Sequence, residues 1–415
     1  MSRTPPPGTA LDRRRVLAWR NAIFLVFALP GLAMASWVSR LPAVRDALDV
    51  SPGQVGLLIV GISVGSITGL VASSHIVARF GAVATITWGL VGTALGISIT
   101  GLAVTLGPSF GFAFVGLMVF GAATGITDVA MNVSGAANER ALGRSIMPIF
   151  HAFFSFGTMV GAAAGALAEF AGLPIATHLG ITGALIVVSI FLVRRFIESE
   201  HVIEEDGQIV AADDPSKSWR GRLSIWRDPR TLLIGVLVLA AAFAEGSAND
   251  WLAIASVDGH GVNNETGALV FGVFVTAMTI GRLGGVFLLD RFGRVAVLRG
   301  SFLLAVIGLL IFIFVPATPL AVVGVVLWGL GSALGFPIGM SAAADDPKTA
   351  AARVSAVATI GYFAFLVGPP VIGLLGEYTG VLHALLIVLV LAAIGSLVAG
   401  AAREPRQSAA TTPLS

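Results

Sequence analysis

The sequence lacks cysteine, and its six histidines are widely scattered. The absence of cysteine excludes disulfides, thiol catalysis and cysteine-ligated metals. No H-x-x-x-H or H-E-x-x-H pair occurs, so we expect no metal and no cofactor. No phosphate loop of the form G-x-x-x-x-G-K-S/T is present, which argues against ATP hydrolysis. Because no catalytic constellation remains, we expect a protein that is not an enzyme.

Charged side chains are also too scarce to cover a water-soluble protein. They make up 12% of the 415 residues, whereas soluble proteins carry about 25%. Hydrophobic residues make up 56%, and the mean hydropathy is +0.92. Lipid must therefore surround most of the chain. The net charge of +2 could suggest a nucleic-acid partner, but the basic residues are better explained as topology signals between membrane spans.

Twelve apolar stretches are long enough to cross a membrane. A spanning helix needs about 20 mainly apolar residues, and lipid offers no partner to an open sheet edge, so these stretches are expected to be helical. The 51 glycines suit close contacts between such helices. The stretches cover residues 19–38, 54–77, 82–105, 108–133, 146–169, 177–197, 230–253, 266–289, 295–316, 318–341, 352–375 and 381–401. The sequence therefore predicts an all-α membrane protein.

The placement of the basic residues supports this count and predicts the topology. With a cytoplasmic N-terminus, the outside loops hold only Arg40 and Arg45, and Arg282 alone lies inside a span. The other Lys and Arg residues then fall in cytoplasmic segments, as the positive-inside rule requires. A miscounted span would reverse this pattern for every later loop. We expect a multi-pass protein of the bacterial inner membrane with both termini in the cytoplasm.

The N-terminal region also imitates a signal peptide. Three arginines at 13–15 precede an apolar run, and Ala33 to Ala35 spell a possible cleavage site. The run nevertheless continues through Trp37, and cleavage would leave eleven spans. We therefore expect this segment to remain as the first span.

The chain repeats itself at an offset of 212 residues. The matching pairs are Gly69 and Gly281, Arg79 and Arg291, Phe80 and Phe292, Gly81 and Gly293, Val83 and Val295, and Ala84 and Ala296. Both copies join an even-numbered span to the next one, which indicates a duplicated six-helix unit of the kind common in transporters. We predict two pseudo-symmetric bundles, at 19–197 and 230–402. This division leaves cytoplasmic segments at 1–18, 198–229 and 403–415. A short helix is expected after Pro215, within the second of them.

The second copy, LDRFGR at 289–294, resembles the loop signature of the major facilitator superfamily, G-x-x-x-D-R-x-G-R-R. It keeps Asp290, Arg291, Gly293 and Arg294, with Val286 and Val295 at the first glycine and last basic positions. The first copy keeps Arg79 and Gly81, but Ala78 and Ala82 replace the Asp and Arg. The resemblance implies the fold of that superfamily, in which spans one, four, seven and ten line the central path.

The signature residues have a plain physical logic. Gly293 permits a tight turn between two helices. Asp290 can pair with an arginine or a helix N-terminus and so hold the cytoplasmic side closed. Alternatively, Arg291 and Arg294 only anchor the loop, and both roles can hold. On the outer side, Arg40 either closes a gate against an acid such as Asp46 or is an exposed loop charge.

Polar groups inside the spans mark candidate binding positions, because they are costly in lipid and usually face an interior or a cavity. Helical spacing places Asp128 and Asn132 on one face of span four, and Glu245 and Asn249 on one face of span seven. Asp250 and Trp251 follow, and Trp251 is expected to anchor the outer interface. His151 lies near the inner end of span five.

We expect Glu245 and Asp128 to carry protons or contact the solute, because an apolar medium favours the protonated form of a carboxylic acid. Alternatives remain open: Asp128 could be a structural carboxylate, Asp250 an interfacial cap and His151 a helix-packing residue. Arg282 must meet a carboxylate or a backbone carbonyl, since a lone guanidinium inside a span would be very unfavourable.

Four strings, SWVSRLPAVRDAL, DVAMN, HAFFSFG and EGSANDW, resemble the YbjJ-like branch of the superfamily, which is related to sugar permeases of the fucose type. This resemblance implies a monomeric secondary transporter of a small polar solute such as a sugar, coupled to protons and surrounded by membrane lipid. Two other interpretations are an exporter of amphipathic compounds and a non-transporting membrane sensor or scaffold. No nucleic-acid partner is expected.

Overall fold

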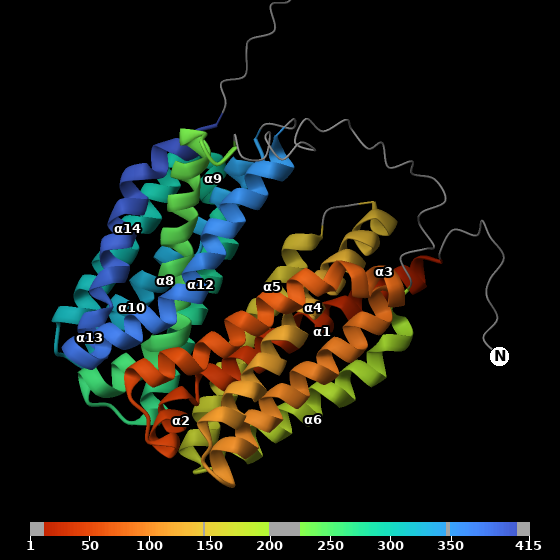
Figure 1. Cartoon of the computed structure of the whole chain (residues 1–415). Coiled ribbons are helices and arrows are strands. Elements are labelled where there is room, and N and C mark those ends of the chain that lie inside the picture. Colours follow the sequence, from red (N-terminus) through yellow and green to blue (C-terminus); the bar gives the residue numbers. More distant parts are fainter. Residues whose placement is uncertain (1–11, 144–145, 199–224, 346–348, 405–415) are drawn as a thin grey trace, which may run out of the picture. The chain divides into compact units, whose positions relative to one another are not determined.

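The computed structural model describes residues 12–143, 146–198, 225–345 and 349–404 (Figure 1). All regular structure within these ranges is helical. The predicted helix after Pro215, most of the predicted linker and most of the two predicted terminal segments lie outside the described residues.

The helices of the first half begin with α1 and end in a short 3-10 turn. They are α1 (Arg13–Val38), α2 (Leu41–Leu48), α3 (Pro52–Thr105), α4 (Phe110–Leu142), α5 (Met147–Phe170), α6 (Ile175–Val193) and η1 (Arg194–Phe196). Those of the second half are α8 (Pro229–His260), α9 (Asn264–Phe314), α10 (Thr318–Ser332), α11 (Gly335–Ala343), α12 (Ala350–Thr379), α13 (Val381–Ala384), α14 (Leu386–Val398) and η5 (Ala399–Ala402).

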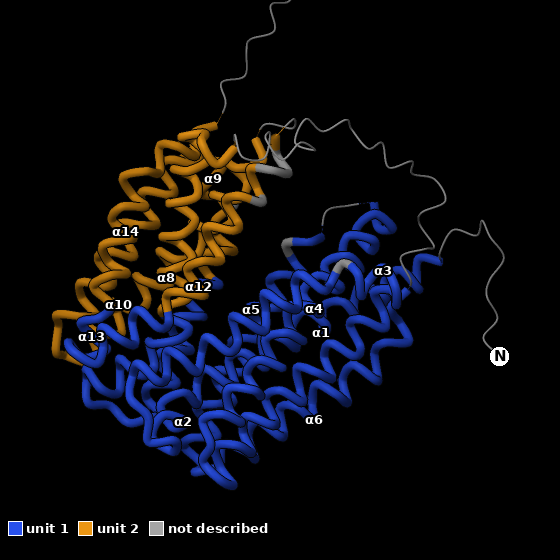
Figure 2. The backbone as a smooth tube through the Cα atoms, viewed as in Figure 1, with its two compact units in different colours: residues 1–209, 248–279, 369–384 blue, residues 210–247, 280–368, 385–415 orange. Residues whose placement is uncertain are grey.

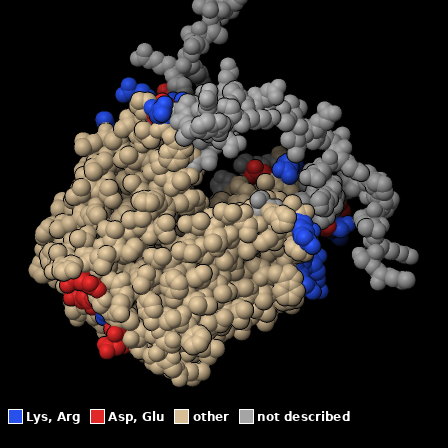
Figure 3. Space-filling view, viewed as in Figure 1, with Lys and Arg blue, Asp and Glu red and all other residues tan. Residues whose placement is uncertain are grey.

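The prediction of twelve spans is confirmed. Twelve helical segments of the described chain are long and apolar enough to cross a membrane. α3 and α9 each contain two of them, at Pro52–Ser73 and His75–Thr105, and at Asn264–Gly285 and Phe287–Phe314. Span seven is longer than predicted, since α8 continues to His260. Figure 3 shows that the visible surface between the helix ends carries almost no charged side chains, as a lipid-facing surface requires.

The described helices form two compact units (Figure 2). Unit 1 contains the first half of the chain up to residue 209 together with residues 248–279 and 369–384. Unit 2 contains residues 210–247, 280–368 and 385–415. Helices α8, α9 and α12 therefore contribute to both units. On α12 the division falls at Pro369, where a ring replaces a backbone N–H donor.

Close packing of helices explains the many glycines, as the sequence predicts. In unit 1, Gly157 and Gly161 face α1, and Cβ atoms there would lie 2.0 Å and 2.5 Å from the carbonyl oxygens of Ala28 and Leu32. Gly121 of α4 packs equally closely on the backbone of α3. No larger residue fits between backbones at this separation. Around this packing lies an apolar core that includes Trp19, Phe27, Phe120 and Phe150.

The repeat is visible in the backbone. Gly81 interrupts α3 with φ 76° and ψ 162°, and Gly293 interrupts α9 with φ 73° and ψ 165°. Residues with a Cβ atom are strongly disfavoured in this region, which is essentially restricted to glycine. The turn predicted at Gly293 is therefore confirmed, and the same turn occurs at the matching position of the first copy.

Candidate functional site

An ion pair within the membrane-spanning part of unit 2 joins Glu245 of α8 to Arg282 of α9. The Arg282 Nη2 atom donates to both Glu245 carboxylate oxygens, at 2.8 Å and 3.0 Å. The two side chains are 19% and 33% exposed, so neither is sealed in the protein interior. The expectation that Arg282 meets a carboxylate is confirmed. The pair supplies a proton-accepting group and a fixed donor at one place in the span.

The position of Glu245 follows from the sequence of α8. It lies 16 residues after Pro229, which is roughly 24 Å along the helix by the rise per residue, close to its middle. Small residues surround it, and Gly246 faces the ring of Phe365, where a Cβ atom would approach to 3.0 Å. The carboxylate reaches Arg282 of α9, two residues beyond the start of unit 2 in that helix.

The candidate pair of span four lies in unit 1. The Asn132 amide donates to the carbonyl oxygen of Asp128 at 2.8 Å and stands 3.4 Å from its carboxylate. Both side chains are half-buried. No basic side chain forms an ion pair with Asp128 in the described part of the chain, so this carboxylate has an amide neighbour where Glu245 has a cation.

The other candidates of unit 1 have different surroundings. His151 is exposed and lies edge-on to the ring of Phe27, with ring centroids 5.2 Å apart. Asn249 and Asp250 are half-buried on α8. The expected interfacial position of Trp251 is wrong: the indole is fully buried and faces Gly373, because α8 continues for more than two turns beyond it.

Arg40 is neither an exposed loop charge nor the partner of Asp46, and both expectations are corrected. It lies between α1 and α2 and is 4% exposed. Its Nε atom forms an ion pair with Glu169 at 2.9 Å, and its Nη2 atom donates to the carbonyl oxygen of Leu173 at 2.7 Å. Burial lowers the pKa of Arg40, and the Glu169 carboxylate opposes this shift. The partners of Arg40 therefore come from the C-terminal end of α5 and the residues just after it, and not from Asp46 of α2.

The region around α2, here called the α2 end of unit 1, joins segments from both halves of the sequence. The Arg45 Nη1 atom donates to Asp258 of α8 at 2.6 Å, and its Nη2 atom contacts Asp46 at 2.9 Å. Asn264, at the start of α9, donates to Asp46 at 3.3 Å. Burial alone would lower the pKa of Arg45, but the hydrogen bonds to Asp258 and Asp46 outweigh it and raise the pKa.

A second link at the α2 end joins α3 to α12. The Ser51 hydroxyl and the Gly53 backbone N–H both donate to the Glu377 carboxylate, the latter at 3.2 Å. Gly373 of α12 approaches Pro52 so closely that a Cβ atom there would lie 2.5 Å from its carbonyl oxygen. Sequence reasoning missed both links, although the scarcity of charges in the loops on this side was a usable signal.

The end of unit 2 where Arg230 and Arg294 lie is here called its basic end. Asp345, which is 7% exposed, accepts from Arg294 at 2.7 Å and from Arg230 at 2.8 Å. Sequence reasoning missed Asp345, because it follows α11 in an irregular segment far from the signature. The signature carboxylate, Asp290, is exposed. Outside the spans, the hydroxyl of Thr231 lowers the pKa of Asp228, which also meets Arg353 at 3.2 Å.

Each of the other two signature arginines lies over the ring of the phenylalanine that follows it in the sequence. The guanidinium carbons of Arg79 and Arg291 are 5.5 Å and 5.6 Å from the ring centroids of Phe80 and Phe292. The two copies of the repeat thus share this contact as well as the turn. Among the described residues, no group of three His, Asp or Glu side chains could hold a metal ion.

Comparisons with known proteins agree with this architecture. The family described as the Major Facilitator Superfamily matches residues 22–364 and 251–414. An uncharacterized MFS-type transporter of Yersinia pestis is 30% identical over 354 residues, which cover 85% of this chain and 88% of the relative.

Solved structures show the same fold. A mutant of the nucleoside transporter NupG superposes with a TM-score of 0.73 at 15% identity, covering 94% of this chain and 99% of the other. The E. coli fucose:proton symporter FucP superposes with a TM-score of 0.63 at 18% identity, covering 95% of this chain and 100% of the other.

Proposed function

The chain belongs to the Major Facilitator Superfamily, and from this premise we propose that it is a proton-coupled secondary transporter of a small polar solute, such as a sugar. The two halves would expose a central site alternately to each side of the membrane. The observation that carries this proposal is the Glu245–Arg282 ion pair within the spans. The four strings that resemble the YbjJ-like branch support a polar solute. We further propose that the protein is a monomer of the bacterial inner membrane with both termini in the cytoplasm.

The ion pair offers a physical route to coupling. While Glu245 is ionised, the pair is neutral as a whole, and each charge compensates the other. Protonation of Glu245 would leave the Arg282 guanidinium without its counter-charge in a poorly solvated place, at a cost of several kcal/mol. A solute oxygen that accepts from Arg282 would offset that cost. Proton binding and solute binding would then favour each other.

The links at the two helix ends are the proposed gates. At the α2 end, Arg45, Asp258 and Glu377 take part in contacts that would have to break for the outer side to open. At the basic end of unit 2, the pairing of Arg294 with Asp345 would hold the cytoplasmic ends of its helices together. Asp290, Arg291 and Gly293 would position the turn that carries Arg294, and Arg79 and Gly81 would position the matching turn of the first copy.

Asp128 is the second proposed coupling group, with Asn132 as its neighbour. Because no cation forms an ion pair with it among the described residues, its protonation would leave no charge stranded. Asn249, Asp250 and His151 are proposed as solute contacts, since their polar atoms lie in spans that carry few other polar groups.

Transport in liposomes tests the coupling. We expect uptake of a sugar panel by the purified protein to rise when an inward proton gradient is imposed. Glu245→Gln and Asp128→Asn should remove the gradient-driven part, whereas the control Asp49→Asn should keep it. Asp49 is an exposed carboxylate at the C-terminus of α2 with φ 51°, a conformation that asparagine tolerates. Full gradient-driven accumulation by both span variants would refute the coupling assignment.

The topology has its own test. An accessibility tag inserted after His260 should be reached from outside the cell, and one after Gly207 only from the cytoplasm. The same reactivity for both tags would contradict the proposed orientation. In the transport assay, movement of amphipathic compounds in place of sugars would favour an exporter. No transport of any compound would favour a membrane sensor or scaffold.

A further inference from the structure

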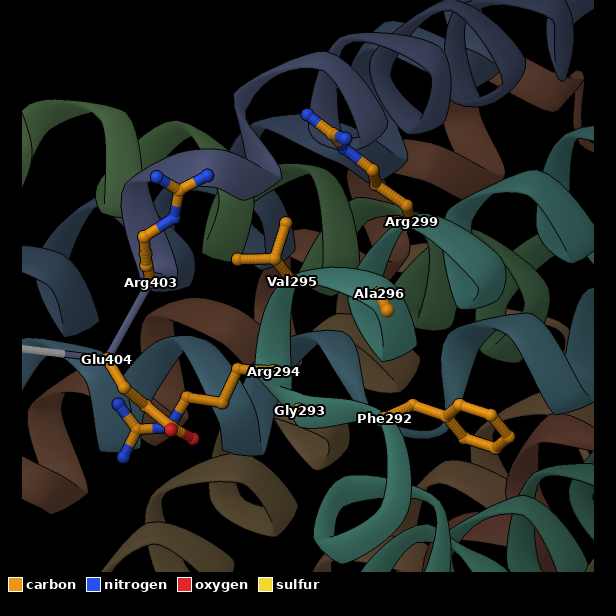
Figure 4. A pocket seen from close by; sticks show the side chains of 8 residues that line it. All are labelled: Phe292, Gly293, Arg294, Val295, Ala296, Arg299, Arg403 and Glu404. Carbon is orange, nitrogen blue, oxygen red and sulfur yellow. The ribbon is translucent and has the colours of Figure 1, made fainter.

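We propose that a pocket at the basic end of unit 2 binds the phosphodiester headgroup of an anionic glycerophospholipid. The pocket has a volume of about 510 Å³ and lies between the turn at Gly293 and the residues that follow η5 (Figure 4). Its charged lining consists of Arg294, Arg299, Arg403 and Glu404. Three guanidiniums and one carboxylate leave an excess of positive charge, so the pocket suits an anion.

Two of the three arginines are available to a ligand. Arg294 already donates to Asp345 and Ser341, and its Nε atom is 3.7 Å from Glu404. Neither Arg299 nor Arg403 uses its guanidinium in a hydrogen bond or ion pair with any described residue, and both are exposed. A guanidinium presents paired donors that match the oxygens of a phosphate. Arg299 and Arg403 reach the pocket from α9 and from the segment after η5, as Figure 4 shows.

An apolar surface for acyl chains continues from this pocket. Helical spacing places Leu303, Ile307 and Leu310 on the same face of α9 as Arg299, and they are 55%, 39% and 42% exposed. Leu397 of α14 is 81% exposed. In a twelve-span protein these side chains face lipid. A phospholipid lying along this face would place its phosphate beside Arg299, whereas a free phosphate ion would make no use of the apolar surface.

The arginines of this pocket that lie on α9 belong to the second copy of the repeat and have no counterpart in the first. At the offset of 212 residues, Arg294 and Arg299 correspond to Ala82 and Thr87, both of which are buried. The first copy forms the same turn without either arginine. The turn therefore does not require them. Asp345 and Ser341 account for Arg294, and a ligand of the second copy better explains the presence of Arg299. Basic pockets between spans on the cytoplasmic side suit anionic headgroups, and we propose the cytoplasmic side for this end.

Lipid binding to the full-length protein tests the proposal. In a neutral detergent, native mass spectrometry should show phosphatidylglycerol bound in preference to phosphatidylcholine. Arg299→Gln combined with Arg403→Gln should weaken phosphatidylglycerol binding about thirtyfold, since each basic group near anionic lipid contributes roughly a factor of five. The matched control combines Arg13→Gln with Arg140→Gln, two exposed arginines of unit 1 that have no proposed role, and should bind as the wild type does.

A variant that is expected to bind phosphatidylglycerol more tightly distinguishes a change in the pocket from a loss of folding. Glu404→Gln removes the carboxylate from the pocket and should strengthen phosphatidylglycerol binding severalfold. Unchanged affinity in the double arginine variant would overturn the proposal, as would an equal loss in the control. If glycerol 3-phosphate displaces the lipid at equal concentration, the pocket serves a soluble phosphoester and the lipid assignment is wrong.

Discussion

A disulfide between α5 and α9 should lock the α2 end of unit 1 and stop transport. A Cβ atom at Gly272 would lie 3.7 Å from that of Ala162, within the range of 3.5–4.5 Å found in disulfides. Both positions lie eight residues from the ends of their helices at this side, about 12 Å deep. Because the chain has no native cysteine, Ala162→Cys with Gly272→Cys introduces the sole thiol pair.

The structure sets the size of the expected effect. Apart from Ala162, no atom lies within 4 Å of a Cβ atom at Gly272, so the substitution itself should cost little. The disulfide would close a loop of roughly 110 residues and stabilise the folded state by about 5 kcal/mol in the chain-entropy account. Alternating access would have to separate two backbones that the bond then holds together.

The assay compares uptake into liposomes before and after reduction. We expect the oxidised double variant to lose transport and the reductant to restore it. The control disulfide, Ala94→Cys with Gly183→Cys, joins α3 to α6 within the first half, where the Cβ atoms would be 3.6 Å apart. The Ser98 hydroxyl, 2.7 Å from the new Cβ atom, must rotate away, and the variant should leave transport intact. Full transport by the oxidised α5–α9 variant would refute a cycle that opens this contact, and a failure to form the bond would contradict the described packing.

Two further predictions concern stability, measured by thermal unfolding in detergent. Glu169→Gln should cost about 3 kcal/mol, because the buried Arg40 guanidinium loses its counter-charge, and converting both residues to Met should recover most of the loss. An unchanged midpoint would show that Arg40 does not depend on Glu169. Gly293→Ala should cost roughly 1–3 kcal/mol at its positive φ, whereas Gly300→Ala, in open space on the same helix, should be neutral or stabilising. Equal effects of the two substitutions on the unfolding midpoint would contradict a positive φ at Gly293.

Most of the fold could be predicted because its determinants are local. The number of spans depends on runs of apolar residues, and each run can be recognised alone. The turn at Gly293 could be predicted from six neighbouring residues, and the structure shows the same turn at the aligned Gly81. The abundance of glycine predicted close contacts between helices. It could not identify α1 as the partner of Gly157 and Gly161 in α5, because composition does not say which helices pack together.

The candidate site could be predicted only in part, since its contacts join distant segments. The sequence required a partner for Arg282, and among several candidates the fold selects Glu245. For Arg40 the sequence left open an acid such as Asp46, six residues away, and an exposed loop position without a partner, and the fold selects Glu169. The carboxylate that receives Arg294 is Asp345, which no motif marks.

The sequence by itself determined that this protein is a bundle of twelve lipid-embedded helices, built from a duplicated unit whose copies share one glycine turn. Hydropathy and backbone freedom decide these features, and both are properties of short segments. Only the tertiary structure decided which charges meet within and beside the spans. Those pairings depend on which helices are neighbours and how each is rotated about its axis, and both follow from the packing of all the helices within a unit together.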